Sequence, residues 1–195
     1  MRGFSLVELL ITLALMIIMV VMFTSRGSQS YQQRQLAACS KNLQQIYVAM
    51  SLYATDNQGR YPILASAVTS EGPLSLLVPK GTTDTEIFTC PGSNDAKLPQ
   101  GAPFANGRIS YAYYMGWTKV EGEPRVLLSD RQVNTGSKKS GELIFSKDGK
   151  GLGDNHSKYG GNLLSGNGEV SAVSPLAAQN LLVPTNIFLL NPKPR

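Results

Sequence analysis

The N-terminal part of the chain carries an apolar run that differs from everything after it. From Phe4 to Phe23 the only charged residue is Glu8, and neither proline nor glycine interrupts the run. A helix of about twenty apolar residues spans the hydrocarbon core of a bilayer. We therefore expect a transmembrane helix over residues 4–25, and Arg2 ahead of it favours a cytoplasmic N-terminus.

Apolar residues recur at spacings of three and four after this run, with Gln, Lys and Asn between them. This period is typical of an amphipathic helix with one buried face. The stretch 57–59 (Asn-Gln-Gly) ends the pattern. Together the two patterns predict one long N-terminal helix from Phe4 to near Asp56, with a transmembrane half and an amphipathic half over residues 26–57. The members of the amphipathic stripe are Leu36, Leu43, Ile46, Tyr47, Met50, Tyr53 and Ala54.

Short apolar runs separated by turn residues fill the second half of the chain. They read as strands, and the Gly-Asn-Gly sequence at 166–168 reads as a hairpin turn between two of them. The sequence therefore predicts an α+β fold, in which the long helix packs on a small antiparallel sheet within a loop-rich C-terminal region. The expected strands lie in 109–117, 125–129, 143–146, 162–165, 169–173 and 187–190.

Composition and charge narrow the function classes. Charged residues make up 16% of the chain, and the 19 glycines and 11 prolines suit loops and short strands better than a helical bundle. The net charge of +5 comes from scattered residues, with Lys138 and Lys139 as the only adjacent basic pair. A nucleic-acid partner is not expected, since such a site needs clustered Lys and Arg.

Cys39 and Cys90 are the only cysteines, and their spacing fits no zinc motif. If the domain lies outside the cytoplasm, the redox environment permits a disulfide between them. We expect this bond, and two buried free thiols are the alternative.

Glu8 is the exceptional residue of the apolar run, because a carboxylate in an apolar span costs roughly 2.5–3.5 kcal/mol and is usually functional. The stretch 3–9 (Gly-Phe-Ser-Leu-Val-Glu-Leu) resembles the prepilin peptidase motif of type IV pilins and type II secretion pseudopilins. The resemblance implies cleavage between Gly3 and Phe4 and N-methylation of Phe4. It also implies that Glu8 pairs with the terminal amine of a neighbouring subunit. A plain signal anchor with an incidental glutamate is the alternative.

Further segments resemble G-like pseudopilins and prepilin-type proteins with an H-x9-DG ending, although Asn167 stands where that ending usually has Asp. The resemblance implies a pilin-like fold. We expect a leader at 1–3, a polymerisation helix at 4–25, its amphipathic continuation at 26–57 and a globular head at 58–195. The segments are Cys39 with 42–46, 53–62, 88–91, 154–156 and 168–170.

The implied function is that of a structural subunit of a type II secretion pseudopilus or a type IV pilus-like filament, not an enzyme. The expected partners are further copies of the chain, prepilin peptidase, an inner-membrane assembly platform, minor pilins or pseudopilins, and the membrane before assembly. The expected location is the bacterial inner membrane, with the domain in the periplasm or outside the cell. A membrane-anchored binding module that never polymerises is the alternative.

Two further features of the second half offer candidate functional residues. His156 is the only histidine, and no nucleophile, base and acid set accompanies it in the sequence. The glycine-rich stretch 148–155 has a composition that suits calcium, which prefers oxygen ligands. Asp148 and Asp154 are its candidate ligands, and a solvated turn is the alternative.

Overall fold

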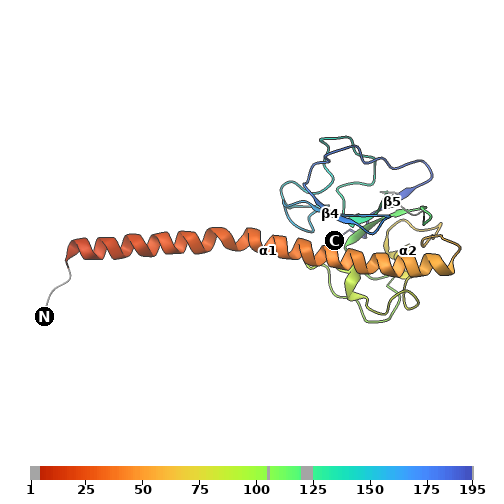
Figure 1. The fold of residues 1–195 in the computed structure, drawn as a ribbon, viewed down its shortest axis with the longest axis horizontal. Coiled ribbons are helices and arrows are strands. Elements are labelled where there is room, and N and C mark those ends of the chain that lie inside the picture. Colours follow the sequence, from red (N-terminus) through yellow and green to blue (C-terminus); the bar gives the residue numbers. More distant parts are fainter. Residues whose placement is uncertain (1–4, 105, 120–124, 195) are drawn as a thin grey trace. The chain divides into compact units, whose positions relative to one another are not determined.

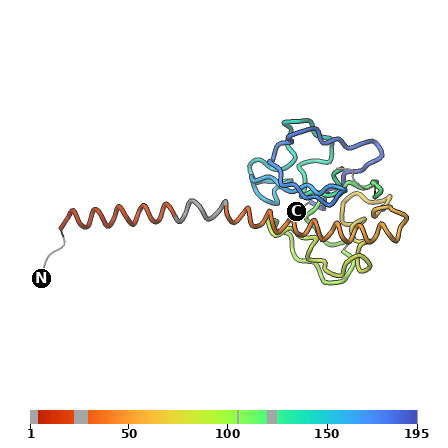
Figure 2. The backbone as a smooth tube through the Cα atoms, viewed as in Figure 1, coloured from red at the N-terminus to blue at the C-terminus, as the bar shows by residue number. Residues whose placement is uncertain are grey.

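The computed structural model describes residues 5–104, 106–119 and 125–194, without the side chains of 23–29. The chain divides into two compact units, Met1–Arg34 and Gln35–Arg195. The division falls within the predicted segment 26–57. The trace of both units is shown in Figures 1 and 2. The leader cleavage site, Gly3 and Phe4, lies outside the described residues.

Helix α1 is assigned over Leu6–Asp56. Its apolar part, as far as side chains are described, covers residues 6–22 and is short. Among the described residues, no helix is both long and apolar enough to cross a membrane. The expected pilin-like α+β fold is therefore wrong in its helical part. The prediction was one long N-terminal helix with a transmembrane half, packed on the sheet, and the structure does not describe such a helix. Residues of α1 within the second unit pack on the sheet.

The second unit is built on one five-stranded antiparallel sheet in the order β4-β3-β2-β1-β5. Glycines 166 and 168 flank the turn between β3 and β4, as the hairpin signal predicted. A register shift between Val126 and Leu128 interrupts the β2–β3 ladder. The strands are β1 (Tyr111–Met115), β2 (Val126–Asp130), β3 (Gly161–Ser165), β4 (Val170–Val173) and β5 (Phe188–Leu190).

Helix α1 covers one face of this sheet, as Figure 1 shows for the second unit. Side chains from the helix and from alternate positions of β1 form one apolar cluster, because successive residues of a strand point to opposite faces. The intervening residues of β1, Ala112 and Tyr114, enter a second cluster on the other face. The buried helix positions are Cys39, Leu43, Ile46, Ala49, Met50 and Ala54.

The remaining segments lie outside the five-stranded sheet. Helix α2 (Glu71–Ser75) and the 3-10 helix η1 (Glu86–Phe88) lie in the connection between α1 and β1. The run 143–146, expected as a strand, forms only an isolated bridge between Leu143 and Leu176. The amides of Ile144 and Phe145 both donate to the carbonyl of Pro175, so this segment packs as a loop instead of entering the sheet.

Candidate functional site

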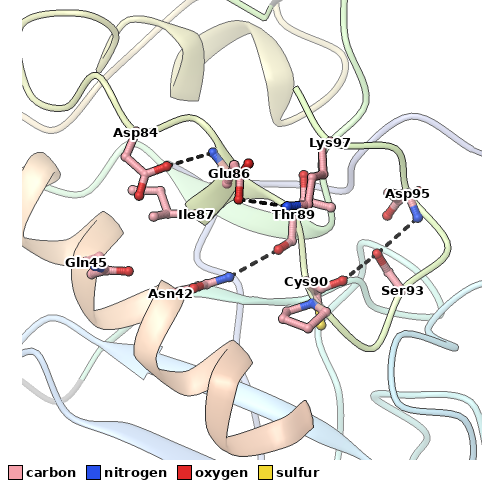
Figure 3. A pocket seen from close by; sticks show the side chains of 11 residues that line it. Asn42, Gln45, Asp84, Glu86, Ile87, Thr89, Cys90, Ser93, Asp95 and Lys97 are labelled. Carbon is pink, nitrogen blue, oxygen red and sulfur yellow. Dashed lines mark hydrogen bonds and ion pairs between the residues drawn. The ribbon is translucent and has the colours of Figure 1, made fainter. Parts of the chain in front are cut away.

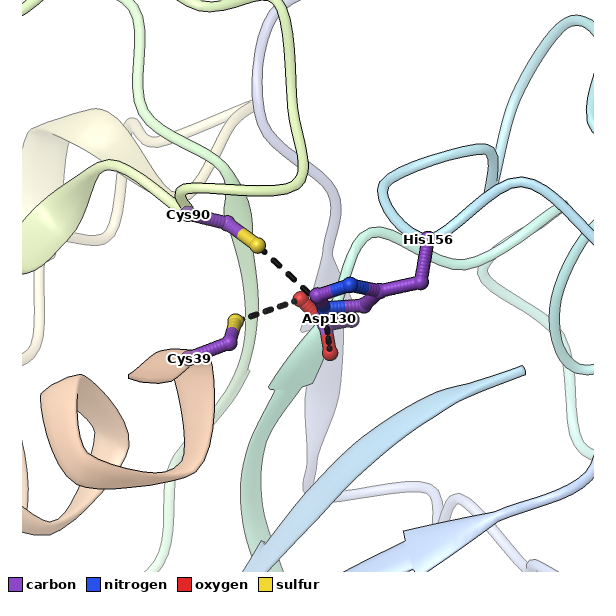
Figure 4. A group of neighbouring side chains, drawn as sticks. All are labelled: Cys39, Cys90, Asp130 and His156. Atoms are coloured by element: carbon purple, nitrogen blue, oxygen red, sulfur yellow. Dashed lines mark hydrogen bonds and ion pairs between the residues drawn. The ribbon is translucent and has the colours of Figure 1, made fainter. Parts of the chain in front are cut away.

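Four side chains with metal-binding atoms meet in the second unit: Cys39, Cys90, Asp130 and His156. They come from four separate segments, as Figure 4 shows. Cys39 lies on the buried face of α1, and Cys90 follows η1. Asp130 is the last residue of β2, and His156 lies in the loop before β3. The fold therefore joins residues that are far apart in the sequence.

The potential ligand atoms of this group lie within 4.8 Å of one another. The Cys39 Sγ is 3.1 Å from the Asp130 Oδ1. The His156 Nε2 lies 3.3 Å from the Cys90 Sγ and 3.3 Å from the Asp130 Oδ2. All four residues are at most 1% exposed, so water does not solvate their polar atoms.

Hydrogen bonds from neighbouring groups fix the orientation of the Asp130 carboxylate. Asn155 donates from its side-chain amide to Oδ1 at 2.9 Å. Asn162 donates its backbone N–H to Oδ2 at 2.7 Å and its side-chain amide to the same oxygen at 3.2 Å. The Tyr111 hydroxyl lies 3.2 Å from the Cys39 Sγ. The surroundings therefore present donors to the group, which is what an anionic site needs.

The turn after Cys90 adds a donor and makes room for the histidine. The Gly92 backbone N–H donates to the Cys90 Sγ at 3.3 Å. A Cβ at Gly92 would lie 2.5 Å from the His156 Nδ1 and 2.5 Å from the Asn155 carbonyl oxygen. Only glycine therefore lets this turn and the histidine loop approach so closely.

Proximity changes the acidity of the four groups. Burial opposes ionisation of Asp130, but the hydrogen bond and charge of His156 outweigh it and lower its pKa. Burial likewise opposes the charged imidazole, yet the bonds to Asp130 and Cys90 raise the pKa of His156 to about 10. Burial raises the pKa of Cys39. For Cys90 the hydrogen bonds from Cys39 and His156 outweigh burial and lower the pKa. The site thus favours an ionised Asp130 carboxylate paired with a charged His156 imidazole, although both are buried.

This group could hold a metal ion, because it supplies two sulfur atoms, one imidazole nitrogen and one carboxylate at short range. The structure carries Cys39 and Cys90 as free, buried thiols instead of the disulfide expected from the cysteine count. Their thiols are engaged with Asp130 and His156, respectively.

A surface pocket of about 500 Å³ adjoins the group, and Cys90 belongs to both (Figure 3). Its walls carry more polar than apolar side chains, and one exposed ion pair, Lys97 with Glu86 at 3.0 Å, lies at its rim. Cys90 therefore lies where this pocket meets the buried group. Its lining residues are Asn42, Gln45, Asp84, Glu86, Ile87, Thr89, Cys90, Pro91, Ser93, Asp95 and Lys97.

The other predicted site residues are not members of this group. Glu8 is exposed in the first turn of α1. The Asp148 carboxylate accepts hydrogen bonds from the Ser146 hydroxyl at 2.9 Å and from the Lys150 N–H at 3.1 Å, and it is exposed. Asp154 is half-buried in the same loop. The described residues that gather as potential metal ligands include neither aspartate.

No protein-family model, no curated protein and no solved structure matches this chain.

Sequence reasoning missed Asp130 as a site residue and considered His156 only as a catalyst or a lone ligand. What the sequence lacked was the position of Asp130 in space. The expected strand 125–129 ends just before this residue. A chain with two cysteines and one histidine already contains three soft or borderline ligands. That composition could have raised a metal hypothesis, but only the fold supplies the fourth ligand.

Proposed function

We propose that this chain is a structural subunit that assembles with further copies of itself through the apolar surface of residues 6–22. One observation carries the proposal: the large apolar side chains of this segment are 54% to 75% exposed. Soluble monomers rarely expose a contiguous apolar surface of this kind, and larger patches mark interaction sites. Neighbouring copies in a filament, and lipid before assembly, are the partners that would cover it.

Glu8 gives this surface a means of fixing the register between subunits. Burying its carboxylate without a partner is costly, whereas pairing with a buried amine offsets the desolvation of both groups. A neighbour in the wrong axial position would leave Glu8 unpaired. After cleavage behind Gly3, the new terminal amine of Phe4 would be the partner, as the resemblance to pilins and pseudopilins implies.

The first test is mass spectrometry of the N-terminal peptide from cells that express the full chain with a prepilin peptidase and its assembly machinery. A peptide that starts at Phe4 and carries one additional methyl group is the expected result. A peptide that starts at Met1 or Arg2 in every fraction would refute processing. Abundance in the sheared extracellular fraction indicates a pilus, and retention in membranes indicates a secretion pseudopilus.

The second test separates assembly from simple anchoring. Glu8→Gln removes the charge with little change in shape, and we expect it to abolish filaments while the second unit stays folded. Thr12→Val is the matched control, because it changes polarity in the same segment without touching a charge, and it should assemble normally. Equal assembly of Glu8→Gln and the wild type would favour a binding module that does not polymerise.

A calcium ion bound by Asp148 and Asp154 is a separate prediction. The Gly-rich loop offers oxygen ligands, which calcium prefers. If the site exists, added calcium raises the melting temperature of the full chain, and the double variant Asp148→Asn, Asp154→Asn loses that response. The same melting temperature with calcium and with a calcium-selective chelator would refute it.

A further inference from the structure

We propose that Cys39, Cys90, Asp130 and His156 bind one zinc ion as a closed, four-coordinate structural site that holds the second unit together. The inference is independent of assembly through residues 6–22. It rests on four observations: the spacing of the ligand atoms, their chemical types, their burial and the groups behind them.

The spacing matches tetrahedral zinc. Zinc–sulfur bonds of about 2.3 Å and zinc–nitrogen or zinc–oxygen bonds of about 2.0–2.1 Å place neighbouring ligand atoms roughly 3.3–3.8 Å apart in a tetrahedron. The three measured separations within the group are 3.1 Å for Cys39 Sγ to Asp130 Oδ1, and 3.3 Å each for His156 Nε2 to Cys90 Sγ and to Asp130 Oδ2. Small side-chain adjustments would therefore admit the ion.

The ligand types select zinc among the common metals. Calcium and magnesium take oxygen ligands, and two thiolates do not suit them. Iron–sulfur clusters take four cysteines, or two cysteines and two histidines in Rieske centres, and this chain has two cysteines and one histidine. Copper(I) favours sulfur ligands, so the Asp130 carboxylate is a poor match for it. Zinc accepts thiolate, imidazole and carboxylate together.

The burial points to a structural site and not to a catalytic one. Catalytic zinc keeps a position open for water or substrate, whereas structural zinc is enclosed by four protein ligands. Here the protein supplies four ligands, and Cys39, Asp130 and His156 are 0% exposed. Cys90, at 1%, is the member that adjoins the surface pocket, which gives the ion a route into the site.

Groups behind Asp130 and Cys90 support the arrangement. Zinc sites keep outer partners that orient the ligands and support their charge. The amides of Asn155 and Asn162 hold the two carboxylate oxygens, and the N–H of Gly92 points at the Cys90 sulfur. Two thiolates and one carboxylate exceed the charge of Zn²⁺ by one, and these donors stabilise the excess.

The consequence for the fold is a cross-link among four segments. The ion would join α1, the loop after η1, the end of β2 and the loop before β3, and its four ligand residues lie far from one another in sequence. Since such a site does not exist in the unfolded chain, the free energy of metal binding contributes to folding. A disulfide between the cysteines would join only the first two of these segments.

The test is the metal content of the full chain, purified in detergent without chelators from zinc-supplemented cells. Mass spectrometry of the metal should find about one zinc per chain, as expected for a single structural site. Cys39→Ser and His156→Gln should each lower this content more than tenfold, whereas Asp56→Asn, at an exposed aspartate that ends α1, should leave it unchanged. Equal zinc in Cys39→Ser and the wild type would show adventitious binding and overturn the proposal.

A second measurement on the wild type covers the case that the variants fail to fold. Cobalt(II) exchanged into the full chain should give the visible bands of a tetrahedral site together with thiolate-to-cobalt charge-transfer absorption. Six-coordinate cobalt without that absorption would overturn the proposal. So would an intact mass lower by two hydrogens with no zinc bound, since that result means that the cysteines form a disulfide.

Discussion

Replacing Asp130 by Asn is the sharpest perturbation of the buried group, because the two side chains have nearly the same shape. Each carboxylate oxygen accepts at least two hydrogen bonds: Oδ1 from Asn155 and Cys39, and Oδ2 from the backbone and side-chain N–H groups of Asn162. An amide places an NH₂ group against one of these pairs of donors, whichever way it is turned. At least two bonds to a charged acceptor are therefore lost.

Each hydrogen bond to a charged group contributes about 1.5–3 kcal/mol, so Asp130→Asn should lower the free energy of unfolding by about 3–6 kcal/mol. A domain of this size is stable by about 5–15 kcal/mol, so the loss is a large fraction of the total. Urea unfolding of the full chain measures it as a lower midpoint at an unchanged m-value. Asp56→Asn is the matched control, because this aspartate is exposed at the end of α1, and a change of about 0.5 kcal/mol is expected there. A loss below about 1 kcal/mol for Asp130→Asn would refute the reasoning.

Two further substitutions test the packing around the group. Gly92→Ala places a Cβ 2.5 Å from the His156 Nδ1 and should lower the free energy of unfolding by about 1–3 kcal/mol, measured by thermal unfolding. Gly136→Ala is the control and should cost far less, because the nearest atom to its added Cβ is 3.6 Å away. Equal effects of the two substitutions would contradict the steric argument. Leu43→Ala in the core face of α1 should cost about 2–5 kcal/mol by urea unfolding, because the side chain is 0% exposed. Val48, on the same helix at 66% exposure, provides the control Val48→Ala, and a similar loss at both positions would refute the assignment of the buried face.

Local patterns along the chain predicted much of the sheet. The aromatic run 109–117 contains β1, and the turn signal at 166–168 lies between β3 and β4. Both features depend on residues close together in sequence. The run 143–146 was mistaken for a strand because its apolar residues pack against Ala177 and Leu163 from a loop, and apolar content alone does not distinguish the two cases.

The helical part shows a different limit of sequence reasoning. The apolar run at the N-terminus has the composition of a membrane helix, but the described residues contain no helix that meets the length and apolarity for a span. The amphipathic stripe was a better guide, since Leu43, Ile46 and Met50 are all buried. The spacing of apolar residues indicates which face of a helix is buried, whereas the apolar composition of a segment alone does not indicate what buries it.

The candidate metal site could not be predicted because its information is tertiary. Zinc motifs are recognised in sequence when ligands occur in close pairs, and here every ligand stands alone on its own segment. Two cysteines in a chain expected outside the cytoplasm suggested a disulfide, which is the simplest use of two thiols. The fold instead places a carboxylate beside one of these sulfur atoms and an imidazole beside the other.

The position of Cys39 bears on how mechanical load would pass from α1 into the sheet. The first residues of the second unit are Gln35 and its successors on α1, and several side-chain hydrogen bonds hold this end of the helix to the unit. Gln35 donates to the Pro91 carbonyl, Asn162 donates to the Leu36 carbonyl, and Cys39 reaches Asp130. Pro91, which accepts the hydrogen bond from Gln35, lies in the turn after Cys90. Asn162, which donates to Leu36, also donates hydrogen bonds to Asp130. If residues 6–22 are held by neighbouring copies, any load on the chain enters the second unit through this part of α1. A metal ion bound at Cys39 would then fasten the helix to the sheet where that load arrives, which a hydrogen-bonded group of thiols could not resist as strongly.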